Sequence, residues 1–227
     1  MSMHSFNCYK DPEKVAQAAA NYIFKEIRVF LAERGVCHIA LPGGTTPARC
    51  LELLALKNLP WENIHCYIGD ERCLPSGHEE RNETMIRAKL WSRVDIPVQN
   101  EHVIEAERGA EVAANLYTSV VNAAGRLDLV VLGMGEDGHT ASLFPDNPAL
   151  DDTRAVVPVY NAPKPPAERV SLSMHTLRAA AHRVALVTGS GKSDAMTQIK
   201  SGSLDLPIAQ LGSICWFLDE AANTETR

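Results

Sequence analysis

The chain has 227 residues, of which 45% are hydrophobic and 22% charged, and a formal net charge of −6. This balance is ordinary for a globular enzyme, and we expect a single domain over residues 1–227. Because the charge is mild and the basic residues are scattered, neither nucleic acid nor an anionic membrane is expected as the main partner.

The first predicted element is an amphipathic helix. Asp11-Pro12 suits the N-cap and the first helical residue, and apolar side chains then recur at helical spacing until Gly35. An apolar run at residues 36–41 predicts a strand. It leads into Pro42-Gly43-Gly44-Thr45-Thr46-Pro47, after which the helical period resumes, so we predict strand, glycine turn and helix in that order.

The alternation of strand and helix continues along the chain. We predict strands at 64–68 and 127–132, a loop through Asp70-Glu71-Arg72, and helices at 84–91 and 107–124. Further strands are predicted at 154–160, 169–173, 183–188 and 213–218. Alternation of this kind predicts an α/β fold with an open, largely parallel, doubly wound sheet and helices on both faces. The proline-rich segment 161–166 predicts a stiff surface loop.

The six cysteines are dispersed, without a C-x-x-C pair or a histidine cluster at zinc spacing. We therefore expect reduced core thiols, with neither a disulfide framework nor a structural metal site. The N-terminus lacks a basic segment followed by an apolar run, and no run approaches the ~18 apolar residues of a membrane span. A cytoplasmic location is the resulting expectation.

The turn at residues 42–47 is a candidate phosphate site. With the helix N-cap placed at Thr46, free backbone N–H groups, the positive helix end and the hydroxyls of Thr45 and Thr46 would converge. The alternative is a tight turn that needs Gly43 and Gly44 for positive φ and binds nothing. The two adjacent threonines and the following proline favour a phosphate.

A second glycine-rich segment follows the strand at 127–132 and carries Glu136, Asp137 and His139. Strands in open α/β sheets deliver ligand-binding groups from their carboxyl ends, and a histidine titrates near neutral pH. We therefore interpret His139 as a candidate general base, which Asp137 or Glu136 could orient or make more basic. The alternative is a histidine that only caps the following turn.

Three familiar motifs are excluded. Residues 133–138 spell G-x-G-x-x-G, but Pro145 and Pro148 interrupt the long helix that a dinucleotide fingerprint must open. Residues 189–193 mimic the end of a Walker A loop, but Leu186 stands where its first glycine is required. No serine lies in G-x-S-x-G, so a hydrolase of this sequence would use water directly.

Three basic residues are candidate ligands for an anion. Arg72 ends a segment expected beside the strand that feeds Gly43, where its guanidinium would donate to a carbonyl oxygen or a phosphate. Arg169 follows the proline loop, and Lys192 lies in a strand-to-helix turn. Taken singly, each is more often a surface charge or half of an ion pair.

Together these motifs resemble the 6-phosphogluconolactonase family, within the glucosamine-6-phosphate isomerase/6-phosphogluconolactonase superfamily. The resemblance rests on residues 42–47, Asp70-Glu71-Arg72 with residues 74–82, residues 133–145, and Pro163-Lys164-Pro165-Pro166 with Arg169. It implies hydrolysis of 6-phospho-D-glucono-1,5-lactone to 6-phospho-D-gluconate in the oxidative pentose phosphate pathway. It also implies a fold similar to glucosamine-6-phosphate deaminase and no metal or organic cofactor.

The resemblance further implies a role for each site residue. The phosphate would be held by Gly43, Gly44, Thr45 and Thr46, helped by Arg169 and Lys192. His139 would act as the base, with Asp137 orienting it and Arg72 near the lactone end. In two departures from the family, threonines replace the usual serines of the glycine turn, and Arg81 stands before Asn82 where a serine is common. The second departure predicts a bulky cation at the rim of the crevice.

Alternatives of the same fold are a deaminase-like isomerase, a sugar-phosphate sensor and a catalytically silent binding protein. Deaminases typically carry a glutamate where this chain reads Leu143-Phe144-Pro145, and an aromatic residue in place of Arg72. A sensor would normally adjoin a DNA-binding helix-turn-helix, whereas the first helix begins almost at once here. We expect a small sugar-phosphate lactone as the partner, no nucleic acid or membrane, and a monomer or weak homodimer.

Overall fold

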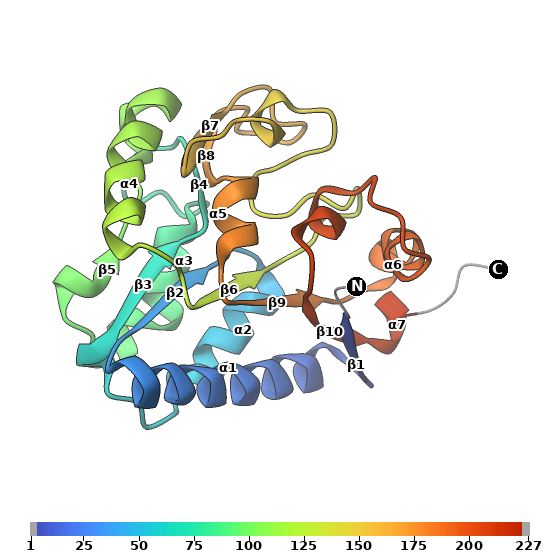
Figure 1. Cartoon of the computed structure of the whole chain (residues 1–227), viewed down its shortest axis with the longest axis horizontal. Coiled ribbons are helices and arrows are strands. Elements are labelled where there is room, and N and C mark those ends of the chain that lie inside the picture. The colour runs from blue at the N-terminus through green and yellow to red at the C-terminus, as the bar shows by residue number, and fades with distance from the viewer. Residues whose placement is uncertain (1–3, 224–227) are drawn as a thin grey trace.

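A computed structural model describes residues 4–223 of the chain (Figure 1). Its main sheet is parallel throughout, in the order β1-β10-β9-β6-β2-β3-β5. These strands are β1 (Ser5–Tyr9), β10 (Cys215–Asp219), β9 (His182–Val187), β6 (Leu129–Leu132), β2 (Cys37–Leu41), β3 (Ile64–Ile68) and β5 (Glu101–His102). The predicted α/β class with an open, largely parallel sheet is confirmed.

A second, antiparallel sheet has the order β4-β8-β7. Its strands are β4 (Asp70–Arg72), β8 (Arg169–Leu172) and β7 (Val156–Val159). The prediction of a loop at Asp70-Glu71-Arg72 is therefore wrong. The two sheets meet at Gly69, whose N–H donates to Leu41 O at 2.9 Å and whose carbonyl accepts from Leu172 N at 2.8 Å.

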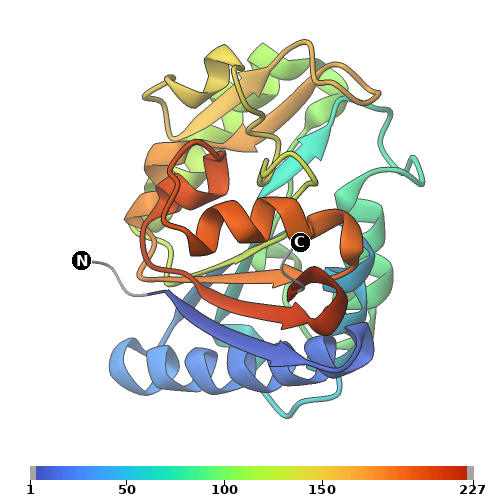
Figure 2. The same ribbon diagram turned by 90° about the vertical axis from the view of Figure 1, so that its right-hand side faces the viewer.

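Helices surround both sheets. They are α1 (Pro12–Arg34), α2 (Thr45–Leu54), α3 (Asn82–Lys89), α4 (Ala110–Ala124), α5 (Met174–Ala179), α6 (Ser193–Lys200) and α7 (Glu220–Asn223). Figure 2 shows α1 on one side of the main sheet and α6 on the other, as the alternation of strand and helix predicts. Among the helices of residues 4–223, none is long and apolar enough to cross a membrane.

The boundaries of α1 follow from its sequence. The Asp11 side chain accepts a hydrogen bond from Lys14 N at 2.8 Å, and Gly35 ends the helix at φ +74°. The helix predicted at 107–124 is instead a 3₁₀ turn at Ala106–Arg108 followed by α4. Gly109 separates them because its φ of +87° suits glycine and not the other residues.

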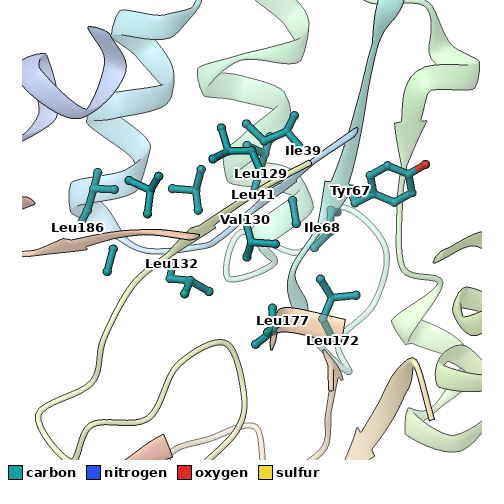
Figure 3. Packing of buried hydrophobic residues seen from close by; sticks show 14 of the residues in the cluster. Ile39, Leu41, Tyr67, Ile68, Leu129, Val130, Leu132, Leu172, Leu177 and Leu186 are labelled. Carbon is teal, nitrogen blue, oxygen red and sulfur yellow. The ribbon is translucent and has the colours of Figure 1, made fainter. Parts of the chain in front are cut away.

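The core lies between the main sheet and its covering layers. All four residues of β6 are buried, which is typical of a parallel strand covered on both faces. Figure 3 shows Leu172 of β8 and Leu177 of α5 among the buried side chains around β2 and β6. The small sheet therefore shares the core of the main sheet, and the strand ends that face it are held firmly.

Candidate active site

A cavity of about 460 Å³ opens at the carboxyl ends of the central parallel strands. This is where an open α/β sheet places its ligands. The lining includes Gly43, Gly44, Thr45 and Thr46 after β2, Gly135 and His139 after β6, Thr188 and Lys192 after β9, and Asp70, Arg72, Asn82, Phe144, Lys164 and Arg169. The sheet thus brings the glycine turn and the histidine loop to one cavity, although the two are far apart in sequence.

The glycine turn is built differently from the prediction. Helix α2 begins at Thr45 and its N-cap is Gly44, not Thr46, because the φ of +100° at Gly44 is accessible to glycine. No side chain caps this helix, so its first N–H groups remain available to a ligand. The Thr46 hydroxyl lies 2.7 Å from that of Thr188, which ties the start of α2 to the end of β9.

Gly43 is required for close packing. A Cβ at this position would lie 1.9 Å from Asn82 Oδ1, so no larger residue fits beside Asn82. Asn82 Nδ2 in turn donates to Asp70 O at 2.6 Å. The turn, the start of α3 and the small sheet therefore form one continuous wall of the cavity.

His139 forms a hydrogen-bonded pair with Asp137. Its Nδ1 lies 2.5 Å from Asp137 Oδ1, which also accepts from His139 N at 3.2 Å. Burial alone would raise the pKa of Asp137, but attraction to His139 and the hydrogen bonds outweigh it and lower that pKa. Asp137 therefore stays ionised, which leaves Nε2 of His139 as the nitrogen that can exchange a proton with a ligand or water.

Glu136, the second acid that the sequence offers as a partner for His139, points away from the imidazole. A Cβ on Gly191 would lie 2.9 Å from Glu136 Oε1, and Glu136 attracts the Lys192 ammonium. Of the two candidate acids, Asp137 is the one in contact with the imidazole of His139. The imidazole also packs on Phe144, with 4.5 Å between ring centroids.

The three candidate cations all line the cavity, each with a different environment. Arg72 donates from Nη1 to Glu80 O. Arg169 is only 7% exposed, and burial lowers the pKa of its guanidinium. Burial likewise lowers the pKa of Lys192, and the nearby Glu136 opposes the shift.

Glu71 and Arg81 lie beneath the cavity wall. Glu71 is fully buried and accepts hydrogen bonds from the N–H groups of Asn82 and Glu83, so its carboxylate caps α3 from a neighbouring strand. Burial raises the pKa of Glu71. Arg81 is 1% exposed and bonded to Glu107 at 2.7 Å, so the expected cation at the rim of the crevice is wrong.

Sequence reasoning assigned no role to several residues that line the cavity. They are Asp70, Phe144, Lys164 and Thr188. Asp70 Oδ2 accepts from Ser142 Oγ at 2.6 Å, a contact between distant segments that carries no local signal. The sequence singled out Lys164 only as a member of the Pro163-Lys164-Pro165-Pro166 motif, without a role of its own. Within residues 4–223, no group of three or more His, Cys, Asp or Glu side chains is arranged to hold a metal ion.

Comparison with known families agrees with this geometry. The profile described as glucosamine-6-phosphate isomerases/6-phosphogluconolactonase matches residues 10–215. The chain belongs to this family. Among curated members, the 6-phosphogluconolactonase of Nostoc sp. is 35% identical, with 94% of this chain and 95% of the relative covered. The 6-phosphogluconolactonase of Mycobacterium tuberculosis is 32% identical, with 96% of each chain covered.

Solved structures of the glucosamine-6-phosphate isomerase/6-phosphogluconolactonase family superpose closely on this chain. The 6-phosphogluconolactonase of Thermotoga maritima has a TM-score of 0.90 at 27% identity, covering 96% of this chain and all of its own. That of Trypanosoma brucei has a TM-score of 0.87 at 25% identity, covering 98% of both. A monomeric glucosamine-6-phosphate deaminase shares the fold, with a TM-score of 0.84 at 19% identity. The match covers 96% of this chain and 98% of the deaminase.

Proposed function

We propose that this chain hydrolyses 6-phospho-D-glucono-1,5-lactone to 6-phospho-D-gluconate. The observation that carries the proposal is a single cavity lined by both an uncapped helix start and His139, whose imidazole is hydrogen-bonded to Asp137. The first suits a phosphate and the second suits proton transfer. Relatives named 6-phosphogluconolactonase, matched over most of their length, support the same reaction.

The phosphate of the substrate binds at the glycine turn. Backbone N–H groups of Gly43, Gly44, Thr45 and Thr46 and the two hydroxyls serve as donors there, and the positive end of α2 favours a dianion. Lys192, in the turn after β9, and Arg169, in the small sheet, add positive charge. With the phosphate held in this place, the sugar ring extends towards His139 and Arg72.

His139 acts as the general base. Its Nδ1–H donates to Asp137, which fixes the tautomer that leaves Nε2 free to accept a proton. Nε2 takes a proton from a water molecule as the water oxygen bonds to C1 of the lactone. The carbonyl becomes a tetrahedral oxyanion, which Arg72 or backbone N–H groups stabilise. The C1–ring oxygen bond then breaks, and the imidazolium returns the proton to the departing oxygen.

These groups supply enough catalysis for this reaction. A positioned base contributes roughly 10² to 10⁴-fold and an oxyanion donor on the order of 10² to 10³-fold. The lactone is an activated ester, so larger factors are not required. We place this reaction in the cytoplasm, as the lactone-opening step of the oxidative pentose phosphate pathway. The whole chain would form one catalytic domain, and the active protein would be a monomer or a weak homodimer.

The test follows lactone opening directly. Freshly generated 6-phospho-D-glucono-1,5-lactone is monitored with the protein and in buffer alone, because the lactone also opens unaided. We expect a protein-dependent acceleration at catalytic concentrations. Glucosamine 6-phosphate is assayed in parallel for ammonia release. Ammonia release without accelerated lactone opening would instead favour a deaminase and contradict the proposal.

A further inference from the structure

Two lysine side chains, Lys192 and Lys164, line the cavity. Lys192 lies in the 3₁₀ turn Ser190–Lys192 that precedes α6, and Lys164 lies in the proline-rich loop between β7 and β8. Both line the cavity, and in the described part of the chain neither ammonium makes a hydrogen bond or a salt bridge. Glu136 attracts the Lys192 ammonium without forming a salt bridge to it, so a ligand can supply the hydrogen-bonding anion that both lysines lack.

The two ammonium groups also act on each other. Burial is the main cause that lowers the pKa of Lys192; attraction to Glu136 opposes this shift, and repulsion from Lys164 adds to it. Both side chains line the same cavity, so one bound anion can interact with both. A dianion between them would remove the repulsion and replace water as the partner of both.

The backbone of Lys164 is held in place by Arg169. The guanidinium donates from Nη2 to Lys164 O at 2.9 Å and to Pro165 O at 3.3 Å, and from Nε to Pro166 O at 3.2 Å. Its Cζ lies 5.6 Å from the ring centroid of Phe144, so the group is fixed on both sides. Most of the donors of Arg169 are thus occupied by the loop, and only Nη1 is left for a ligand.

The loop itself is stiff. Three prolines restrict φ on either side of Lys164, and Ala162 N donates to Ala167 O at 3.0 Å across the base of the loop. Because the backbone is ordered before binding, only the lysine side chain loses freedom when a ligand arrives. An exposed side chain on such a loop is arranged to bind with little entropic cost.

We propose that Lys164 is a further substrate-binding residue, whose ammonium acts with that of Lys192 to hold the dianionic phosphate monoester against the glycine turn, while Arg169 is a positioning residue for its loop. This inference rests on the proposed function, because it concerns the phosphate end of the same substrate. Two cations match two negative charges, so the pair selects a phosphate dianion over an uncharged hydroxymethyl group.

The test compares Lys164→Met and Lys164→Arg with the wild-type protein. We expect Lys164→Met to raise KM for the phosphorylated lactone roughly 10- to 100-fold, with a much smaller change in kcat, since it loses a bond to a charged group. The effect on unphosphorylated gluconolactone is expected to be far smaller. Lys164→Arg keeps the charge and should recover most of the loss.

The matched control is Lys57→Met, because Lys57 bonds to Asn21 and does not line the cavity. Its kinetics should equal those of the wild-type protein. Wild-type kinetics in Lys164→Met, or an equal rise of KM for both lactones, would overturn the inference, since the second result describes a purely structural role.

A binding measurement separates this inference from the proposed function. Calorimetric titration with 6-phosphogluconate and with gluconate requires no turnover. Lys164→Met should weaken the binding of 6-phosphogluconate by a factor similar to its rise in KM. If the wild-type protein hydrolyses neither lactone, the proposed function fails, whereas unchanged binding of 6-phosphogluconate by Lys164→Met would refute the role of Lys164 alone.

Discussion

Histidines lie near the amino ends of some strands of the main sheet and beyond the carboxyl end of another, and their surroundings differ. His38, His65 and His102 lie in β2, β3 and β5, near the amino ends of the first two strands, whereas His139 follows the carboxyl end of β6. His65 contacts His38 and His102, these two also contact Tyr67, and none of the three histidines lines the cavity described above. His139 contacts a carboxylate and lines that cavity.

The histidines of β2, β3 and β5 form a stack. Ring centroids are 4.9 Å apart for His38 and His65, and 5.3 Å for His65 and His102. His65 Nδ1 lies 3.0 Å from His102 Nε2, so one ring donates to the other. Burial lowers the pKa of His102 to about 4, with further lowering by the neighbouring rings. These residues are uncharged at neutral pH and serve packing.

The difference teaches what distinguishes a functional histidine. His38, His65 and His102 lie in strands of the main sheet and His139 lies in the loop after β6, and all four are partly buried. Only His139 combines an ionised partner, a cavity and glycines that allow close approach. A histidine at the amino half of a parallel strand lacks these features, because the ligand edge is at the other end.

The largest effect is expected from removing the His139 imidazole. His139→Ala should lower kcat for the phosphorylated lactone about 10² to 10⁴-fold, because the base is lost, while binding of 6-phosphogluconate changes little. His182→Ala is the matched control, since His182 also pairs through Nδ1 with a carboxylate, that of Glu26, but lies outside the cavity. Turnover by His139→Ala at the wild-type rate would exclude His139 as the base.

The second prediction concerns Gly135. A Cβ here would lie 2.0 Å from His139 Nδ1 and 2.5 Å from Asp137 Oδ1, so Gly135→Ala must displace the pair. Misplacement of a catalytic group by about 1 Å costs on the order of 10²-fold, and we expect kcat to fall by that amount.

Gly133→Ala is the control for the segment, because nothing lies within 4 Å of a Cβ there. NMR signals of the His139 imidazole should then be displaced in Gly135→Ala and remain at their wild-type positions in Gly133→Ala. Identical imidazole signals in both variants would mean that Gly135 does not hold the pair.

The smallest effect is expected from the histidine stack, and it concerns stability. The unfolded chain protonates His102 near pH 6.5, whereas folded His102 resists protonation until about pH 4. The free energy of unfolding should therefore fall as the pH decreases between these values, by roughly 1–2 kcal/mol for this partly exposed group.

In His102→Phe the ring remains and the titration is lost. Denaturant midpoints measured between pH 7 and 5 should accordingly depend less on pH than in the wild-type protein, with activity near neutral pH retained. Parallel pH dependences in the two proteins would show that His102 is not the titrating group.

Local patterns were sufficient to predict the parallel sheet, the glycine turn and the position of His139. Each of these depends on a short apolar run followed by glycine, and the parallel sheet brings both turns to one edge. The small sheet was not predicted, because β4 has only three residues, all charged, and its partner β8 lies about a hundred residues later.

The inward position of Arg81 depends on Glu71, Glu83 and Glu107, which no local pattern connects. Strands β1 and β5 were missed because one is polar at an edge and the other has two residues.

The contact between Gly43 and Asn82 has a genetic consequence. An alanine at position 43 and an asparagine at position 82 cannot occupy the same space, so the two positions are expected to mutate together. A side chain at position 43 is expected to require a smaller residue at position 82. The residue at this glycine turn is thereby tied to the choice of residue in a helix that lies 39 positions further along the chain.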